Sequence, residues 1–258
     1  MLELSDAQIG GWVGTFLLPL FRIAAVFMTM PIIGTNMVPA RVKLYMALAF
    51  TALLVPTLPP MPQVDAVSVQ ALPLIAEQIL IGALMGFSLQ LFFHVFVIAG
   101  QLLSTQAGLS FASMVDPANG ISVPVLGQFF NVLVTLLFLS MNGHLIVMEI
   151  LAESFTTLPV GQLLSVDHFW ELAGKLSWVL GAGVLLVLPA ITALLVVNLA
   201  FGVMTRAAPQ LNIFSIGMPL TVSLGLVIIW IGTADIFSHY ESLVTEALQW
   251  LRELVRAR

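Results

Sequence analysis

Long uncharged apolar stretches dominate the chain and are separated by short polar or turn-forming passages. The apolar residues fall into six segments, at about 11–31, 44–58, 73–107, 125–150, 176–204 and 213–236. A helix that spans a bilayer needs about 20 mostly apolar residues, so these segments predict membrane helices, with 44–58 short for a span. In the tail, 237–258, apolar residues recur at helical spacing and predict a packed or interfacial helix.

The segment 73–107 is too long for a simple span. At 1.5 Å per residue, an unbroken helix of this length reaches about 50 Å, against about 30 Å for the hydrocarbon core of a bilayer. The helix must therefore be tilted, broken or partly outside the lipid. It also carries Gly82 and Gly86 four residues apart, a spacing that lets two helices approach closely.

The passage 101–120 lies between two regions without Asp, Glu, Lys or Arg, from Gln78 through Val115 and from Pro117 through Met148. Asp116 is the one carboxylate between them, and Pro117 and Asn119-Gly120 follow it. Proline removes a backbone donor and Asn-Gly favours a turn, so the preceding helix should end here. Irregular backbone at membrane depth is tolerated only inside protein or along a wet cavity, which makes this passage the first candidate for a functional centre.

Composition agrees with a membrane protein. The chain is 60% hydrophobic and 8% charged, with a mean hydropathy of +1.08, whereas soluble domains are about a quarter charged. The net charge of −5 comes with no basic patch, which argues against nucleic acid as a partner. The absence of cysteine excludes disulfides, thiolate metal sites and thiol catalysis. The acidic start, Met1–Asp6, is unlike a cleaved signal peptide, so the first apolar segment should be retained.

Charge placement gives a conflicting topology. We expect Glu149–Lys175, with four carboxylates and one lysine, to be the main polar connection, and Asp167 to cap the helix that follows. Arg41 and Lys43 place the first connection in the cytoplasm by the positive-inside rule. Six simple spans then leave the arginines of the tail on the opposite side, against the same rule.

Several kinds of site remain open from the residues alone. Ionisable groups in or beside apolar segments, here Arg22, Glu77, Asp116 and Arg206, serve either as ion pathways or as structural pairs. Gly108-Leu-Ser110-Phe111 fits the short G-x-S-x pattern of intramembrane serine proteases, with His144 as a possible base, but the pattern is short and close packing of small residues explains it better. A secondary transporter with broken helices is a third reading. No HExxH or Walker A pattern occurs, and we predict no catalytic residues, metal or cofactor.

One long stretch resembles a known family. Residues 198–220, Asn-Leu-Ala-Phe-Gly-Val-Met-Thr-Arg-Ala-Ala-Pro-Gln-Leu-Asn-Ile-Phe-Ser-Ile-Gly-Met-Pro-Leu, closely resemble the signature region of the FliR family, the flagellar counterparts of the SctT proteins of type III secretion. Four further stretches also fit the family: Phe21-Arg22 leading to Pro31–Gly34, Pro39-Ala-Arg41, Glu77 before Gly82 and Gly86, and Gln106–Pro117. The resemblance covers nearly the whole chain.

The resemblance implies an all-α membrane protein with about six kinked helical segments and a single domain over 1–258. Residues 1–175 would be FliP-like, and 176–258 would be a FliQ-like hairpin with an amphipathic tail. The chain would be a non-enzymatic subunit of the flagellar export gate, assembled with FliP and FliQ and served by FlhA and FlhB. Unfolded flagellar proteins would pass through it. It would lie in the bacterial inner membrane at the flagellar basal body, partly raised toward the periplasm. The equivalent virulence secretion subunit is the alternative.

The resemblance also implies three sets of site residues. A loop would plug the channel, with Phe111, Met114 and Val115 as its apolar contacts and with Gly108, Leu109, Ser110, Ala112, Ser113, Asp116 and Pro117 as its other members. The cytoplasmic entrance and its partner contacts would involve Arg206, Pro209, Gln210 and Asn212. Helix packing or ion pairing would involve Arg22, Glu77, Gly82 and Gly86.

Overall fold

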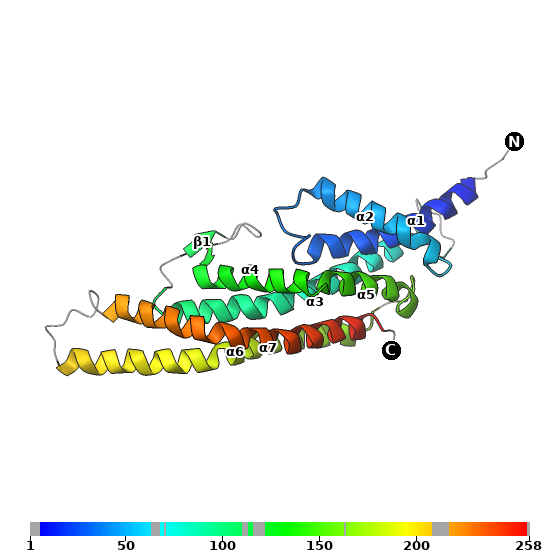
Figure 1. The fold of residues 1–258 in the computed structure, drawn as a ribbon. Helices are drawn as coiled ribbons and strands as arrows, with labels where there is room; N and C mark the ends of the chain where they lie inside the picture. The colour runs from blue at the N-terminus through cyan, green and yellow to red at the C-terminus, as the bar shows by residue number, and fades with distance from the viewer. Residues whose placement is uncertain are drawn as a thin grey trace. The chain divides into compact units, whose positions relative to one another are not determined.

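The computed structural model is helical almost throughout and confirms the predicted class, an all-α membrane protein. It describes residues 6–62, 68–69, 71–109, 113–115, 122–162, 164–207 and 217–256. The elements, in chain order, are α1 (Asp6–Thr29), α2 (Ala40–Leu54), the short 3₁₀ helix η1 (Val55–Thr57), α3 (Ala71–Gln106), β1 (Ser113–Val115), β2 (Ser122–Pro124), α4 (Val125–Ser140), α5 (Gly143–Thr157), α6 (Val166–Ala207) and α7 (Met218–Leu254) (Figure 1).

The described helices account for the predicted apolar segments. Ala40–Thr57, Ala71–Gln106 and Val166–Ala207 are each long and apolar enough to cross a membrane. Two bent pairs, Val125–Ser140 with Gly143–Thr157 and Pro219–Gly232 with Ile236–Leu254, raise the number of possible spans to five. Gly14–Thr29 is a shorter apolar helix. All six segments are therefore helical, and 71–106 is a single helix.

The fourth predicted segment is broken into α4 and α5. Asn142 adopts a left-handed conformation with φ of 58°, which interrupts the helix. Gly143 follows it, and a Cβ at this position would lie 2.5 Å from Phe138 Cε2. Close packing against the Phe138 ring therefore requires glycine here. Asn-Gly is a pair that favours a turn, and in the structure it stands at a full break between the two helices.

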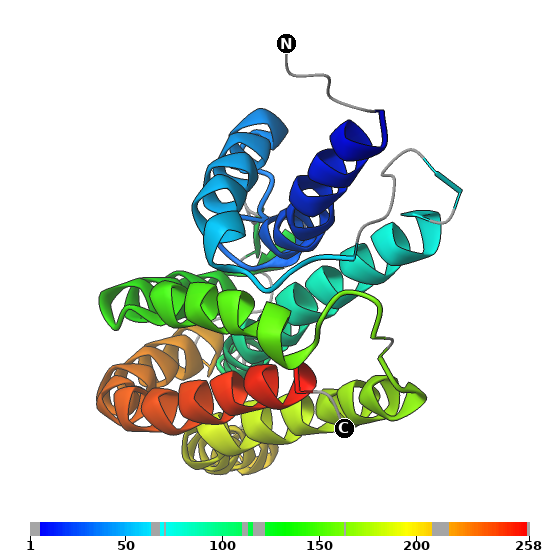
Figure 2. The same cartoon turned by 90° about the vertical axis from the view of Figure 1, so that its right-hand side faces the viewer.

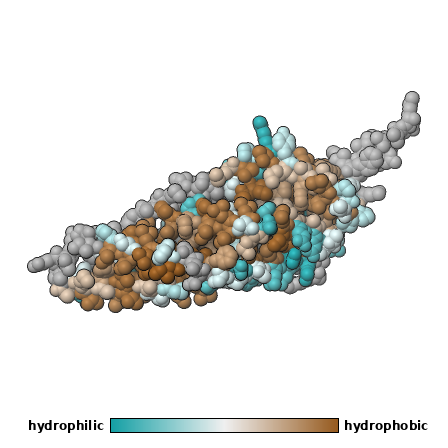
Figure 3. Space-filling view, viewed as in Figure 1, coloured by the Kyte–Doolittle hydropathy of each residue, from teal (hydrophilic) through white to brown (hydrophobic). Residues whose placement is uncertain are grey.

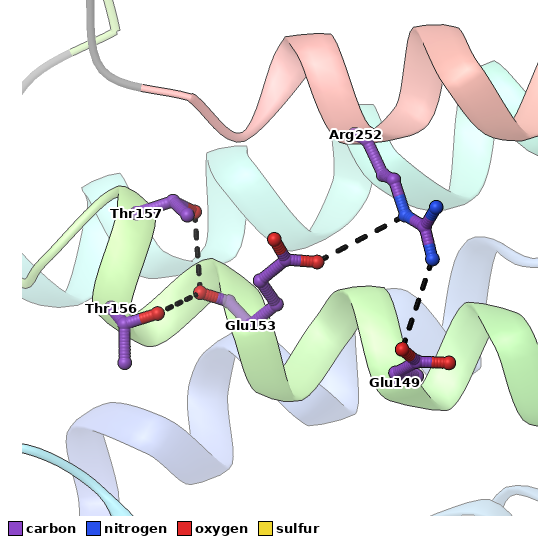
Figure 4. A network of polar contacts seen from close by, with 5 residues as sticks. All are labelled: Glu149, Glu153, Thr156, Thr157 and Arg252. Carbon is purple, nitrogen blue, oxygen red and sulfur yellow. Dashed lines mark hydrogen bonds and ion pairs between the residues drawn. The ribbon is translucent and has the colours of Figure 1, made fainter.

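The prediction of a long polar connection over Glu149–Lys175 is wrong. Helix α5 continues to Thr157 and α6 begins at Val166, so only 158–165 connects them. Glu149 and Glu153 lie on a partly exposed face of α5, where Arg252 approaches them at 3.8 and 4.0 Å (Figure 4). These carboxylates mark a solvated helix face, which sequence alone does not distinguish from a loop. Asp167 lies within the first turn of α6 and is not its N-cap.

The amphipathic tail is helical and packed, and it forms the second arm of the bent pair Pro219–Gly232 and Ile236–Leu254. It continues the sixth segment as α7, which runs to Leu254. Tyr240, Val244, Leu251 and Val255 from the apolar stripe of this tail are buried. The stripe therefore faces protein.

Contacts divide the chain into two compact units that interleave along the sequence. One unit comprises Met1–Gln90, Phe138–Ala173 and Glu246–Arg258, and the other comprises Leu91–Leu137 and Gly174–Thr245. In the first unit, α1 and α2 lie side by side (Figures 1 and 2), with the rings of Phe27 and Phe50 5.9 Å apart. In the second unit, Phe92 and Phe96 from α3 enclose the Tyr240 ring, with centroid distances of 5.7 and 6.0 Å.

Candidate functional site

The predicted plug begins at a well-defined helix end. Helix α3 stops in a left-handed glycine, Gly108, with φ of +74°. The Leu109 N–H donates to Ser104 O at 2.8 Å and the Gly108 N–H donates to Thr105 O at 3.3 Å, the two bonds of a Schellman motif. A Cβ on Gly108 would meet nothing closer than 3.7 Å, so the backbone conformation, rather than space, favours glycine here.

Beyond this turn, the structure describes part of the predicted plug. Ser113–Val115 form strand β1, which pairs antiparallel with β2 so that Met114 lies opposite Val123. Sequence analysis did not predict this ribbon, although Asn119-Gly120 between the strands is a strong hairpin signal. Ser110, Phe111, Ala112, Asp116 and Pro117 lie outside the described residues. The expected roles of the Phe111 side chain and of Asp116 therefore stay predictions.

The predicted cytoplasmic entrance is described only at its first residue. Arg206 lies exposed in the last turn of α6. A positive charge at this position complements the partial negative charge of a helix C-terminus. Pro209, Gln210 and Asn212 lie outside the described residues, so their predicted partner contacts stay predictions.

Arg22 is the centre of a buried polar cluster. Its side chain is fully buried in the middle of α1. The Nε donates to Gln78 Oε1 at 2.7 Å, Nη1 donates to Ser154 O and Oγ at 2.8 and 3.1 Å, and Nη2 donates to Leu158 O at 3.0 Å. The guanidinium also lies 4.4 Å from the centre of the Phe155 ring. Arg22 thus joins α1 to α3 and to the C-terminal end of α5.

Glu77 belongs to the same cluster through Gln78. Its Oε1 accepts hydrogen bonds from the Gln78 amide at 3.3 Å and from the Gly161 N–H at 3.2 Å. The Gln78 amide therefore bridges Arg22 and Glu77, while Glu77 holds the turn after α5. A buried charge is tolerated when its hydrogen-bonding groups are satisfied and an opposite charge is near; Arg22 donates to Gln78, Ser154 and Leu158, and the Glu77 carboxylate attracts it electrostatically. Gln78 and Ser154 were missed from sequence, because polar uncharged residues in apolar helices carry no distinctive spacing.

Gly82 and Gly86 bring α3 against α1. A Cβ on Gly82 would collide with Arg22 O and lie 2.8 Å from Ala25 Cβ. A Cβ on Gly86 would collide with Thr29 Oγ1 and lie 2.8 Å from Met30 N. The four-residue spacing of small residues therefore serves close helix contact in this unit.

The protease reading gains no support from the described residues. Ser110 lies outside them, and His144 lies in the first turn of α5. Within the part of the chain that the structure describes, no group of three or more His, Asp or Glu side chains could hold a metal ion.

The fold and the buried polar cluster together define an α-helical membrane protein in which charged groups are enclosed by helices. The sequence model described as Bacterial export proteins, family 1, matches residues 13–247, and the chain belongs to that family. The chain is 39% identical to the flagellar biosynthetic protein FliR of Escherichia coli (strain K12), over 99% of this chain and 98% of the relative. It is 36% identical to FliR of Pectobacterium carotovorum subsp. carotovorum, with the same coverage, and 32% identical to FliR of Aquifex aeolicus (strain VF5), over 88% and 90%.

These relatives confirm the predicted family and its membrane and flagellar protein-export character. Their names describe biosynthetic and export proteins, not a class of enzyme.

Proposed function

We propose that the chain is a subunit of the flagellar type III export gate, assembled with FliP and FliQ around a channel for unfolded flagellar proteins. Residues 1–175 take the FliP-like part and 176–258 the FliQ-like hairpin. The complex lies in the inner membrane at the flagellar basal body, partly raised toward the periplasm. FlhA and FlhB act at its cytoplasmic side, with FlhB close to Arg206.

One observation carries this proposal: the exposed apolar surface of α6 is longer than a bilayer can cover. Large apolar side chains stand exposed from Leu176 to Met204, and apolar residues dominate the visible face over this part of α6 and the start of α7 (Figure 3). At 1.5 Å per residue this stretch measures about 42 Å, and at an average tilt of about 20° it still covers about 40 Å. A hydrocarbon core of about 30 Å leaves the remainder for other protein.

In this proposal, 108–117 is the channel plug. Its residues are uncharged up to Asp116 and so bind no passing ion strongly, and its apolar side chains exclude water. The left-handed Gly108 gives the backbone freedom where the passage leaves α3. An extended polypeptide displaces the plug during export, and the plug reseals the channel afterwards.

Co-expression with FliP and FliQ, followed by native mass spectrometry, tests the assembly. We expect one large complex that contains a single copy of this chain. Leu199→Trp, on the exposed apolar stretch, should lower the yield of this complex without lowering the amount of the chain itself. Val166→Trp, equally exposed on the same helix but outside that stretch, is the matched control. A stable monomer or homodimer without partners would contradict the proposal and favour a transporter that works as the isolated chain.

A further inference from the structure

The last turn of α3 is held by two helices from the other end of the chain. The Asn198 Nδ2 of α6 donates to Gln106 O at 3.2 Å. Ala107, the next residue, is fully buried, and Gly225 of α7 lies against it. A Cβ on Gly225 would come within 2.7 Å of Ala107 Cβ, so α7 can approach this turn only because residue 225 has no side chain.

The hydrogen bond from Asn198 fills a gap in the helix end. The Schellman motif uses the carbonyls of Ser104 and Thr105, and the Ala107 N–H uses that of Leu103. These bonds leave the Gln106 carbonyl among the groups that a helix C-terminus cannot satisfy internally. The side-chain amide of Asn198, on the neighbouring helix α6, donates the hydrogen bond that this carbonyl lacks within its own helix.

We propose that Asn198 and Gly225 are positioning residues that fix the C-terminal turn of α3 and thereby set the resting position of the plug that follows it. This inference rests on the proposed function of 108–117. Helix α6 continues from Asn198 for two turns to Arg206, about 12 Å along a rigid element. A displacement of the α6–α7 pair therefore moves the turn from which the plug departs.

The test uses the whole complex with FliP and FliQ in planar bilayers, with the frequency of openings in the absence of substrate as the readout. Asn198→Ala removes the hydrogen bond without a clash. We expect openings about fivefold more frequent at unchanged complex yield, which corresponds to about 1 kcal/mol, the net contribution of one hydrogen bond. Thr192→Val is its control, because this exposed hydroxyl on the same helix bonds to Pro189 O within its own helix and, among the described residues, to no other group.

Gly225→Ala provides an independent arm. Its methyl group must displace Ala107, so we again expect more frequent openings. Adding Ala107→Gly removes the opposing Cβ, and the double variant should return to the unmodified frequency. Gly232→Ala on the same helix is the control, because a Cβ there meets nothing within 4 Å. If the double variant recovers the unmodified frequency of openings, the effect of Gly225→Ala comes from its contact with Ala107 and not from a general loss of stability.

The comparison arm is deletion of Gly108–Asp116 in the same complex. Suppose the complex with this deletion conducts ions without substrate, while the Asn198→Ala and Gly225→Ala complexes open as rarely as the unmodified one. The positioning role is then wrong, and the plug assignment is supported. If the deletion itself does not leak, the plug assignment is wrong and the positioning role falls with it. The inference would also be overturned if each variant lowered the yield of the complex as much as it raised the frequency of openings, and if Ala107→Gly restored neither. Both residues would then act only in folding.

Discussion

The buried cluster around Arg22 gives the sharpest test of how this protein is held together. Arg22→Met removes the guanidinium and leaves a flexible apolar side chain of comparable length. The carbonyl of Ser154 still accepts the Leu158 N–H, and its hydroxyl still donates to Leu151 O. Gln78 Oε1 and Leu158 O, in contrast, have no second donor among the described residues.

The expected loss follows from those two acceptors. A buried polar group left without a partner costs about 1–3 kcal/mol, and the contact of the guanidinium with the Phe155 ring contributes about 0.5–2 kcal/mol more. Glu77 also loses the nearby positive charge. We therefore expect Arg22→Met to lower the free energy of unfolding by about 3 kcal/mol or more, close to the sum of the lower values for two unpartnered acceptors and the lost ring contact.

Arg252→Gln is the matched control. Arg252 is a second arginine in the same unit, but its side chain is 43% exposed and it meets Glu149 and Glu153 at 3.8 and 4.0 Å (Figure 4). Exposed pairs of this kind contribute about 0–1 kcal/mol. The assay is unfolding of the purified chain by SDS in mixed micelles, followed by tryptophan fluorescence.

A second substitution separates the charge from the hydrogen bonds. Glu77→Gln keeps an acceptor for the Gly161 N–H and removes the carboxylate charge. Added to Arg22→Met, it should recover part of the lost stability, since no uncompensated charge then remains buried. Equal losses for Arg22→Met and Arg252→Gln would refute the reasoning, because burial of the network would then contribute nothing beyond a surface pair.

Three further outcomes are expected. Gly82→Val should disrupt the contact of α3 with α1 and lower stability by about 1–3 kcal/mol, as overpacking does. Gly174→Ala, inside α6 where a Cβ meets nothing within 4 Å, should not lower it and should raise it by up to about 1 kcal/mol, because alanine favours a helix over glycine; thermal stability in detergent measures both. Deleting Gly108–Asp116 should leave assembly possible and make the membrane permeable to small ions, and unchanged conductance would exclude the plug. Arg206→Glu should impair export more than complex formation, whereas equal loss of both, by secretion assay and pull-down, would make Arg206 structural.

The apolar pattern of the sequence predicted most of the helices, and it predicted their ends where a strong local signal marked the end. The segment 73–107 was predicted to be helical and either tilted, broken or partly outside the lipid, and α3 occupies 71–106 without a break. Its end at Gly108 is the left-handed glycine that commonly terminates helices. Long uncharged runs leave few alternatives to a helix in a membrane, because every backbone group must be satisfied within the segment.

The failures have a common physical cause, which is that a charge pattern does not reveal its partner. Glu149 and Glu153 indicated a solvated connection, but their side chains lie along α5 beside Arg252, a hundred residues away in sequence. Arg22 was expected to serve an ion pathway or a structural pair, and only the fold shows that Gln78, Ser154 and Leu158 accept its hydrogen bonds. Asn198 carried no sequence signal for a bond to the end of α3.

The most direct test of the proposed gate is to ask whether an export substrate passes the plug position. A substrate fused to a stably folded domain stalls in the channel, and a photo-crosslinking amino acid at Met114 reports what lies beside it. Trp170, exposed near the start of α6, is the control position. We expect the stalled substrate to crosslink at Met114 and not at Trp170. A stalled substrate, verified by blocked export, that crosslinks at neither position or equally at both would contradict the role of this chain in lining and gating the channel.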